Sequence, residues 1–355
     1  MKALITGGAG FIGSALARHV VRNLEGSAAV VDCLTYAGHL SSLAPIADSP
    51  RFQFMKIDIC DLSAMEAAIR QYQPTVVFHL AAESHVDRSI ADAAAFINTN
   101  LVGTYNVLEA SRRYWDTLND PEREAFRVVH VSTDEVYGSL DATGLFREDT
   151  PYDPRSPYSA SKAGADHLAS AWRHTYGLPV VISNCSNNYG PYQLPEKLIP
   201  LMILNGLHGA KLPVYGDGKN VRDWLYVTDH VEALCLIAER GEPGRSYNVG
   251  GRNERTNIEI VNAVCSLLDR LSPAETARAS LIEYVADRPG HDRRYAIDAS
   301  RLEGELGWRA KETFDTGIEK TVQWYLDNEA WWGPLRSAGV GVNRLGLGAA
   351  TKGSQ

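Results

Sequence analysis

The sequence predicts an α/β protein in which a doubly wound parallel sheet is joined to a smaller mixed α/β domain. Short apolar runs rich in β-branched residues alternate with longer amphipathic segments through the first half of the chain, as in sheets whose two faces are both covered by helices. With 355 residues and 45% apolar composition, the chain can bury such a core. Strand–helix alternation of this kind also implies right-handed crossovers between parallel strands.

Five apolar runs predict strands, and the segments between them predict helices. The strands are expected at residues 3–6, 28–32, 75–82, 127–132 and 178–186. Helical periodicity covers residues 13–24, 63–72 and 98–115, and a further helix is expected to begin near Ser156 and Pro157. After about residue 186 the alternation loosens and Gly, Pro, Tyr and Arg become frequent. Such loops are typical of a lid or of a substrate-binding domain.

Charge and cysteine content exclude several classes of protein. The net charge is −8 and no long Lys/Arg run is present, which argues against a nucleic-acid-binding surface. The five cysteines form no C-x-x-C pair, so we expect neither a disulfide framework nor a metal site, and a reducing cytoplasm is favoured. No run of 18 apolar residues occurs, so no membrane-spanning helix and no membrane partner are expected.

A glycine-rich turn directly after the first predicted strand indicates a dinucleotide site. Residues 6–13 read TGGAGFIG and place Gly7, Gly10 and Gly13 in a G-x-x-G-x-x-G spacing. Glycines at these positions let the backbone turn tightly and approach a pyrophosphate, which then meets the N-terminus of the following helix. Asp32 ends the second strand, where an acidic side chain accepts hydrogen bonds from ribose hydroxyls and repels a 2′-phosphate. The pattern predicts a Rossmann-type domain that binds NAD rather than NADP.

A second motif lies on the helix that follows the fourth strand. Tyr158 and Lys162 have a Y-x-x-x-K spacing, which places both on one helical face. An ammonium beside the phenol is expected to lower the pKa of Tyr158, so that the phenol can act as a base near neutral pH. Thr133 ends the preceding strand and supplies a hydroxyl that fits such a site. Combined with the glycine turn, the motif predicts a short-chain-type dehydrogenase or reductase.

Three carboxylates stand at predicted strand ends and each has two interpretations. Asp58 lies where a third strand would end, either near the adenine or as a simple turn cap. Asp134 and Glu135 follow Thr133 without an intervening Gly or Pro, and they form either a solvated turn or a matched acid and base. Beside Tyr158 and the dinucleotide site, the acid–base interpretation is favoured.

Nine segments together carry a family resemblance over about residues 1–330. They read TGGAGFIG, LTYAG, HLAAESHVDRS, STDEVYG, SPYSASK, NCSNNYGPY, PEKLIPL, RDWLYV and DRPGHDRRYAID. In these motifs the chain resembles the nucleotide-sugar dehydratases of the extended short-chain dehydrogenase/reductase family, in particular those that act on dTDP-glucose. The resemblance implies a redox-neutral cycle in deoxysugar or rhamnose-type precursor biosynthesis. Sugar C4 is oxidised, water is eliminated across C5 and C6, and hydride returns from the cofactor to C6, which gives dTDP-4-dehydro-6-deoxy-D-glucose.

The resemblance also implies roles for individual residues. Tyr158, with Thr133 and Lys162, serves the oxidation at C4, Glu135 is the base at C5, and Asp134 is the acid at C6. Two like charges at close range favour one protonated partner, which is the division that elimination requires. The residues implied for NAD binding are Gly7, Gly10, Phe11, Ile12, Gly13, Asp32, Thr35, Asp58, Ile59, Ala81, Ser84, Thr99, Tyr158, Lys162 and Asn188. Those implied for substrate binding are Ser84, Thr133, Asn187, Lys197, Leu198, Pro213, Tyr215, Arg222, Asn257, Arg288 and His291.

One position departs from the family pattern. Relatives often carry Lys where this chain has Cys33. Because Asp32 and Thr35 remain, we expect little effect on the choice of cofactor.

The same reasoning predicts domains and an oligomeric state. Residues 1–186, with roughly 220–250, are expected to form the NAD-binding domain, and residues 187–219 and 251–330 the nucleotide-sugar-binding domain. Residues 331–355 end in a Gly- and Ala-rich stretch and are expected to form a poorly ordered tail. The predicted helix over residues 98–115 and the helix that carries Tyr158 are apolar on more than one face, which together with the resemblance predicts a homodimer packed through four helices.

Three other functions remain open from the sequence. A nucleotide-sugar 4-epimerase performs the same first oxidation but has no need for the pair Asp134 and Glu135. A dehydratase of another nucleotide-glucose is a second alternative, since base choice depends on loops. An NAD-binding sensor or scaffold would lack catalysis, although it has no reason to retain Tyr158, Lys162 and both carboxylates.

Overall fold

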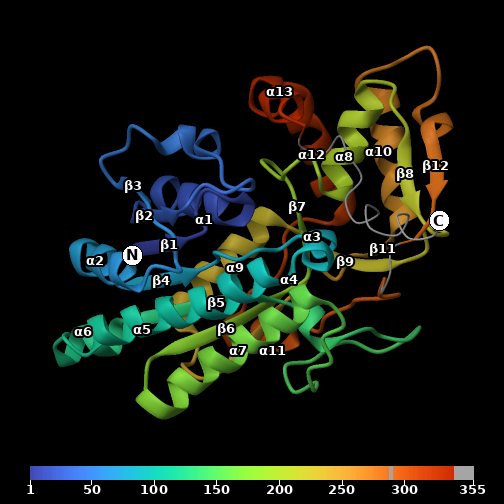
Figure 1. Cartoon of the computed structure of the whole chain (residues 1–355). Coiled ribbons are helices and arrows are strands. Elements are labelled where there is room, and N and C mark those ends of the chain that lie inside the picture. The colour runs from blue at the N-terminus through green and yellow to red at the C-terminus, as the bar shows by residue number, and fades with distance from the viewer. Residues whose placement is uncertain (288–290, 340–355) are drawn as a thin grey trace, which may run out of the picture.

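The computed structural model describes residues 1–287 and 291–339, and its centre is a seven-stranded sheet in the order β10-β6-β5-β4-β1-β2-β3 (Figure 1). All neighbouring strands in this sheet are parallel. The strands are β1 (Lys2–Thr6), β2 (Ser27–Asp32), β3 (Phe52–Lys56), β4 (Val76–His79), β5 (Arg127–Thr133), β6 (Val180–Cys185) and β10 (Ser246–Val249). The predicted doubly wound parallel sheet is therefore confirmed.

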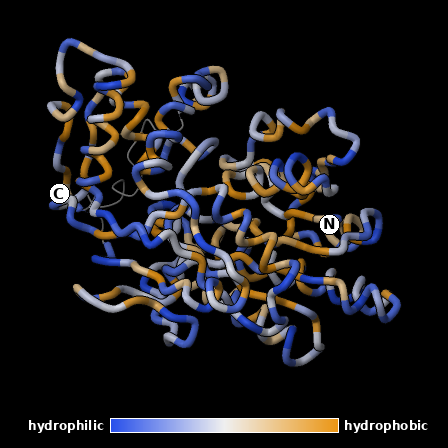
Figure 2. Tube along the Cα trace, turned by 180° about the vertical axis from the view of Figure 1, so that it is seen from behind, coloured by the Kyte–Doolittle hydropathy of each residue, from blue (hydrophilic) through white to orange (hydrophobic). Residues whose placement is uncertain are grey.

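Helices cover both faces of the sheet, which explains why its strands are continuous apolar runs. Against one face pack α1 (Phe11–Arg22), η1 (Leu40–Ile46), α9 (Val227–Arg240) and α11 (Ser300–Leu306). Against the other pack α2 (Leu62–Tyr72), α5 (Thr104–Trp115) and α7 (Pro157–Tyr176). In Figure 2 the hydrophobic residues follow the strands and the inner sides of these helices.

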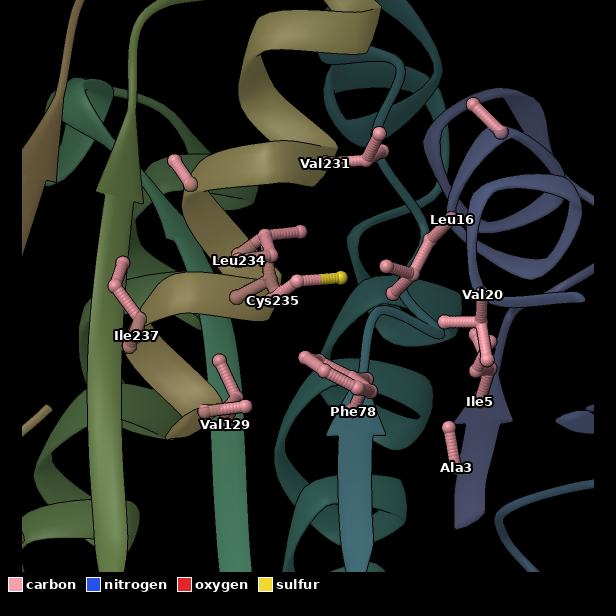
Figure 3. Close-up of a cluster of buried hydrophobic side chains, with 14 of the residues drawn as sticks. Ala3, Ile5, Leu16, Val20, Phe78, Val129, Val231, Leu234, Cys235 and Ile237 are labelled. Carbon is pink, nitrogen blue, oxygen red and sulfur yellow. The ribbon is translucent and has the colours of Figure 1, made fainter. Parts of the chain in front are cut away.

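Alternate side chains of β1 enter separate cores on the two faces. Ile5 belongs to the cluster with α1 and α9, whereas Leu4 belongs to the cluster with α2 and α5. Figure 3 shows the first cluster, in which Phe78 of β4 lies between Leu16 of α1 and Leu234 of α9. All of these side chains are fully buried, so the order of the central strands is fixed by packing on both sides.

The chain reverses its direction of travel along the sheet between β1 and β4. It moves outward from β1 through β2 to β3, and then returns to place β4 on the other side of β1. Ligands of open α/β sheets bind at the carboxyl ends of the strands beside such a reversal. The loops after β1, β2, β4, β5 and β6 therefore meet at one edge.

A second group of elements lies beyond that edge, at the upper right of Figure 1. It contains a parallel pair of strands, β8 (Leu212–Tyr215) with β12 (Ile282–Val285), and a three-stranded sheet of β11 (Glu254–Thr256), β9 (Val221–Tyr226) and β7 (Asn187–Tyr189). Its helices are α8 (Leu198–Leu207), α10 (Asn257–Leu271), α12 (Phe314–Asp327) and α13 (Glu329–Ser337), with a short turn η4 (Arg278–Leu281). These elements share their own hydrophobic cluster.

The remaining short elements surround the sheet edge and the ends of the long helices. They are α3 (Val86–Ala91), α4 (Ala93–Ile97), the π-helical segment η2 (Asn98–Gly103), α6 (Asp120–Ala125) and η3 (Asp134–Tyr137). The helix predicted over residues 98–115 thus begins as a π-helix and continues as α5. Gly103 ends the π-helical segment, and a Cβ at this position would overlap the side chain of Ile59.

The poorly ordered tail was predicted to begin at residue 331, which is too early. Residues 331–337 belong to α13, so the expectation of poor order is wrong for them. Trp331 and Trp332 are buried, and the Trp331 indole donates a hydrogen bond to Ser42 Oγ at 3.2 Å. The aromatic pair gives this segment an apolar face. The segment was grouped with the tail because the residues that follow it are rich in Gly and Ala. Residues 340–355 lie outside the described part of the chain.

The structure bears on two expectations drawn from composition. All five cysteines are free thiols, in agreement with the absence of a predicted disulfide framework. Among the described residues, no helix combines the length and the apolar character needed to span a bilayer.

Replacement of Trp331 by Ala is expected to lower the free energy of unfolding by about 3 kcal/mol, because it removes a buried aromatic side chain and leaves a cavity. Urea unfolding of the two proteins measures the difference. Ser337→Ala, at an exposed position of the same helix, is the control and is expected to change stability by less than about 0.5 kcal/mol. A Trp331→Ala protein as stable as the parent would show that α13 does not contribute to the fold.

Candidate active site

A cleft of about 370 Å³ lies at the carboxyl edge of the central sheet. The loops after β1, β2 and β4 line one part of it, and the end of β5, the helix α7 and residues 185–197 line the rest. Every residue that the sequence suggested for cofactor binding lines this cleft. The topology thus brings together side chains that are up to 180 residues apart in the chain.

At two positions of the glycine-rich segment after β1, only glycine fits without a clash. Gly7 has a φ of +68°, and a Cβ there would lie 2.7 Å from the Cα of Ala81 in the loop after β4. A Cβ on Gly13, in the first turn of α1, would collide with the carbonyl oxygen of Gly7. The backbone therefore forms an open cradle in front of the N-terminus of α1, where orphan N–H groups favour a phosphate. These residues fit the pyrophosphate of a dinucleotide.

Asp32 connects the glycine turn to the end of β2. Its Oδ2 accepts a hydrogen bond from the Ala9 amide at 3.0 Å and its Oδ1 accepts one from the Leu34 amide at 2.8 Å. Burial raises the pKa of Asp32, while the two amides oppose that rise. Each carboxylate oxygen retains a further acceptor site, which suits the hydroxyls of an adenosine ribose. Asp58 also lines the cleft, and it caps a local turn by accepting from the Cys60 amide at 2.9 Å.

Tyr158 and Lys162 project from the first two turns of α7. The helix begins with a capping box in which Ser156 and Ser159 exchange hydrogen bonds, and Pro157 occupies its first position. Both functional side chains are buried, and both line the cleft. The Lys162 ammonium donates to the carbonyl of Val131 at 2.9 Å.

The predicted lowering of the Tyr158 pKa is wrong for this structure. Burial raises the pKa of Tyr158 well above its usual value, and the nearby Glu135 raises it further. A hydrogen bond with Thr133 acts in the opposite direction. The Lys162 ammonium is directed at the backbone of β5.

The two carboxylates at the end of β5 lie in different environments. Thr133 ends the strand and caps η3 by accepting from the Glu135 amide at 3.3 Å. Glu135 is half-buried and lines the cleft, whereas Asp134 is 2% exposed and lies behind it. Burial raises the pKa of Asp134 well above its usual value, and the charges of Glu135 and Asp223 add to the rise. The arrangement favours a protonated Asp134 beside an accessible Glu135.

The residues suggested for substrate binding separate into two sets. Ser84, Thr133, Asn187 and Lys197 line the cleft together with the suggested cofactor residues. Ser84 is not a helix cap, because α3 begins at Val86 with His85 as its N-cap.

The second set lies farther along the second group of elements. Leu198, Pro213, Tyr215, Arg222 and Asn257 belong to α8, β8, β9 and α10 and do not line the cleft. The Arg222 guanidinium donates to the carbonyl of Val221 at 2.7 Å and to that of Asp292 at 3.0 Å.

His291 completes the described part of this second set, and Arg288 lies outside the described residues. The His291 ring approaches Tyr215 at 6.2 Å between centroids and pairs with Asp287 at 2.6 Å. It also lines a separate, open cavity beside residues 139–142 and 219–221.

The sequence reasoning missed several cleft residues, and four of them have long polar side chains. They are Tyr36, Glu83, Gln193 and Glu196. Glu196 lies 3.6 Å from the Arg88 guanidinium, which in turn stacks on the Tyr36 ring at 3.7 Å. Tyr36 and Glu196 belong to the motifs LTYAG and PEKLIPL, which carry part of the family resemblance. The motifs were therefore visible in the sequence, but nothing in the sequence indicates that these two loops meet.

The family model described as GDP-mannose 4,6 dehydratase matches residues 4–321 of this chain. A dTDP-glucose 4,6-dehydratase from Neisseria meningitidis serogroup B is 56% identical over 352 residues, which cover 98% of this chain and 99% of the relative. A probable dTDP-glucose 4,6-dehydratase from Sinorhizobium fredii is 59% identical, and the match covers 98% and 99% of the two chains.

Solved structures agree with these sequence matches. The dTDP-glucose 4,6-dehydratase of Streptomyces venezuelae, solved with NAD bound, has a TM-score of 0.87 and 45% identity, over 94% of this chain and 100% of that chain. The UDP-glucose 4-epimerase of Thermus thermophilus, also in complex with NAD, has a TM-score of 0.81 and 31% identity, over 92% and 100%. The fold is thus shared by dehydratases and epimerases, and the site must distinguish them.

Replacement of Asp32 by Asn is expected to weaken NAD binding about tenfold and to reduce the preference for NAD over NADP. The amide cannot accept hydrogen bonds at both positions, and the charge that repels a 2′-phosphate is lost. Calorimetric titration of each variant with NAD and with NADP measures both effects. Asp61→Asn makes the same chemical change at the N-cap of α2, outside the cleft, and is expected to leave both affinities unchanged. If Asp32→Asn also left them unchanged, Asp32 would not contact the ribose.

Proposed function

The chain belongs to the GDP-mannose 4,6 dehydratase family, and we propose that within this family it dehydrates dTDP-D-glucose to dTDP-4-dehydro-6-deoxy-D-glucose. It is an NAD-dependent hydro-lyase of deoxysugar precursor biosynthesis, as are the relatives named dTDP-glucose 4,6-dehydratase that match it over nearly their full length. NAD is its cofactor, in keeping with the NAD-bound structures of similar dehydratases.

The observation that carries the proposal is the contrast between Asp134 and Glu135. Elimination of water needs one carboxylate to accept a proton and one carboxylic acid to donate a proton on the same sugar edge. Asp134 is buried with a raised pKa, whereas its neighbour Glu135 faces the cleft. An epimerase never breaks a C–O bond and gains nothing from such a pair.

Oxidation at C4 is assigned to Tyr158. We propose that Tyr158, in its ionised form, takes the proton of the C4 hydroxyl. Bound NAD would supply the hydride acceptor for C4 and the hydride donor for C6. Thr133 stabilises the ionised phenol through the hydrogen bond that lowers the pKa of Tyr158. Lys162 holds its ammonium beside the site, where it can also bind a ribose hydroxyl.

Elimination is assigned to the adjacent carboxylates. The ketone at C4 acidifies the C5–H bond, so that Glu135 can remove this proton as a general base. Asp134, whose protonated form burial favours, donates its proton to the departing C6 hydroxyl. Because the pKa of Asp134 is raised, this donor is present below that pKa and is lost as the pH rises through it.

The nucleotide end of the substrate is assigned to the second group of elements. We propose that Asn187 and Lys197 contact the phosphates from the cleft, and that Leu198, Pro213, Tyr215, Arg222, Asn257, Arg288 and His291 surround the nucleotide beyond it. Binding of a phosphate by Arg222 would compete with the two backbone carbonyls to which its guanidinium donates.

Product identification tests the proposal. The purified protein is incubated separately with dTDP-, UDP-, GDP- and CDP-glucose, and the products are identified by NMR and mass spectrometry. We expect a 4-keto-6-deoxy product from dTDP-glucose at a rate well above that from the other three. Accumulation of the C4 epimer alone would indicate an epimerase, and neither product nor a change in NADH absorbance would indicate an NAD-binding sensor or scaffold.

Glu135→Gln is expected to lower formation of the 4-keto-6-deoxy product by about a hundredfold or more, since the amide cannot remove the C5 proton. Oxidation at C4 does not need this carboxylate, so NADH is expected to accumulate when dTDP-glucose is added. Absorbance at 340 nm and product analysis on one sample measure the two steps.

Tyr158→Phe is the matched contrast. It removes the proposed base at C4 and is expected to abolish the NADH signal that the Glu135 variant retains. Glu124→Gln, at an exposed position before β5, controls for the loss of a carboxylate and is expected to behave as the parent. Unchanged product formation by Glu135→Gln would refute the assignment of the C5 base.

We also propose that two copies associate through η2, α5 and α7. Ile97 at the end of α4, Val102 of η2 and Tyr105 of α5 are 45%, 44% and 38% exposed. The Tyr105 ring packs edge-on against Trp172 of α7 at 5.7 Å, so the exposed apolar side chains and α7 form one surface. The two helices run parallel, since Asn100 bonds to Ser161 near the start of α7 and Glu109 bonds to Trp172 near its end. Such a pair, joined by the pair of a second copy, suits a four-helix interface. The cytoplasm is the proposed location, since a reducing compartment suits five free thiols.

Sedimentation at micromolar concentration is expected to give the mass of two chains. Val102→Glu places a charge in the proposed interface and is expected to shift the protein to the mass of one chain. Leu24→Glu changes an equally exposed leucine at the end of α1 and is expected to leave the dimer intact. A parent protein that sediments as one chain would exclude the dimer.

A further inference from the structure

A buried carboxylate outside the assigned machinery lies directly behind the catalytic residues. Asp166 is on α7, one turn after Lys162 and two turns after Tyr158, and is 2% exposed. It accepts hydrogen bonds from His130 Nε2 at 3.0 Å, Ser132 Oγ at 2.8 Å, Tyr152 OH at 2.9 Å and Asn184 Nδ2 at 3.4 Å. In the described part of the chain no arginine or lysine forms an ion pair with it.

The donors to Asp166 hold the end of β5 in place. His130 and Ser132 belong to β5, and Ser132 immediately precedes Thr133. Asn184 of β6 donates both to Asp166 and to the carbonyl of Thr133, the latter at 3.3 Å. The carboxylate thus joins α7, β5 and β6 at the point where the strand gives way to the catalytic turn. A buried carboxylate that bonds to neutral donors alone is costly to retain, so a function for its charge is expected.

Asp166 acts electrostatically on the Lys162 ammonium, whose residue lies one turn earlier on the same helix. Burial lowers the pKa of Lys162, and Asp166 is the first group that opposes this effect, followed by Cys185 of β6. The other titratable groups packed around the ammonium are His130 of β5 and His79 of β4, and the phenol of Tyr158 on the same helix.

These neighbours carry no compensating negative charge near neutral pH. Burial lowers the pKa of both His79 and His130, so their rings are neutral. Burial raises the pKa of the Cys185 thiol to about 12 and raises that of Tyr158 well above its usual value, which favours the protonated form of both before substrate is oxidised. Asp166 is therefore the anion that can balance Lys162.

We propose that Asp166 is a positioning residue for the oxidation at C4, whose carboxylate fixes the end of β5 against α7 and keeps Lys162 as a charged ammonium. The inference depends on the proposed function, since it concerns the first step of that reaction. Asp166 acts through Lys162 and Ser132 and contacts neither substrate nor cofactor: it does not line the cleft. Loss of its charge should make Lys162 neutral at a lower pH than in the parent.

The test isolates the oxidation step with dTDP-xylose, a sugar nucleotide that has no C6 and so can be oxidised but cannot eliminate water. NADH appearance is followed in single turnovers of the NAD-loaded enzyme between pH 6 and 10. In Asp166→Asn the alkaline limb of the rate is expected to move to lower pH by about one unit, because removal of a nearby anion lowers the pKa of an ammonium. The maximal rate is expected to fall about tenfold.

Tyr152→Phe is the matched control. It removes one donor to Asp166 and leaves the carboxylate in place, so its alkaline limb is expected to coincide with that of the parent. If the Asp166 variant lost rate equally at every pH, Asp166 would have a structural role only, and the proposal would be overturned. A profile identical to the parent's would overturn it as well.

A second measurement covers the case in which Asp166→Asn fails to fold or the parent does not oxidise dTDP-xylose. The parent holoenzyme is labelled with lysine carrying ¹³C at Cε, the Lys162 signal is assigned with Lys162→Met, and its shift is followed with pH. A signal that remains that of an ammonium up to pH 8 supports the inference, and deprotonation below pH 8 overturns it. A parent with this titration but no activity towards dTDP sugars would refute the proposed function alone.

Discussion

Exclusion of water from the carboxyl end of β5 is the constraint on which the chemistry of this molecule depends. Three ionisable side chains there are almost completely buried, namely Asp134, Tyr158 and Lys162. Burial disfavours the charged form of each, so it favours the acid form of Asp134, while the hydrogen bond with Thr133 favours the ionised form of Tyr158. Glu135 is half-exposed at the cleft. Asp134 and Glu135 are adjacent, and they follow the end of β5 at the boundary of the core. The first is buried and the second faces the cleft, which divides the roles of proton donor and proton acceptor between them.

Residues whose environment is set by local motifs could be predicted from the sequence. Gly7, Gly10 and Gly13 follow a strand and open a helix, and Tyr158 and Lys162 occupy one helical face. Because the carboxyl ends of parallel strands meet at one edge, correct strand assignments were sufficient to bring these motifs into one cleft.

Features that depend on contacts between distant loops could not be predicted in this way. Tyr36 and Glu196 are 160 positions apart and meet through Arg88. The direction of the Tyr158 pKa shift was missed because helical spacing places Lys162 on the right face but does not say which acceptor its ammonium reaches. That acceptor is the carbonyl of Val131, a matter of strand and helix packing. The nucleotide end of the site depends on the same kind of long-range contact and stays a prediction.

The C-terminal helix shows how the two halves of the cleft are connected by side chains that do not line it. The Trp331 indole of α13 donates a hydrogen bond to Ser42 of η1, the short helix that follows β2. Its ring packs against Tyr192 with 5.3 Å between the ring centroids. Tyr192 has a φ of +68° and lies beneath the guanidinium of Arg18, which itself donates to the carbonyl of Ser42. A non-glycine residue in the left-handed region is retained where surrounding contacts compensate for its cost. The next residue, Gln193, lines the cleft together with the glycine turn. The aromatic contacts therefore hold residues 192–197, which include Lys197, against the part of the chain that follows β2.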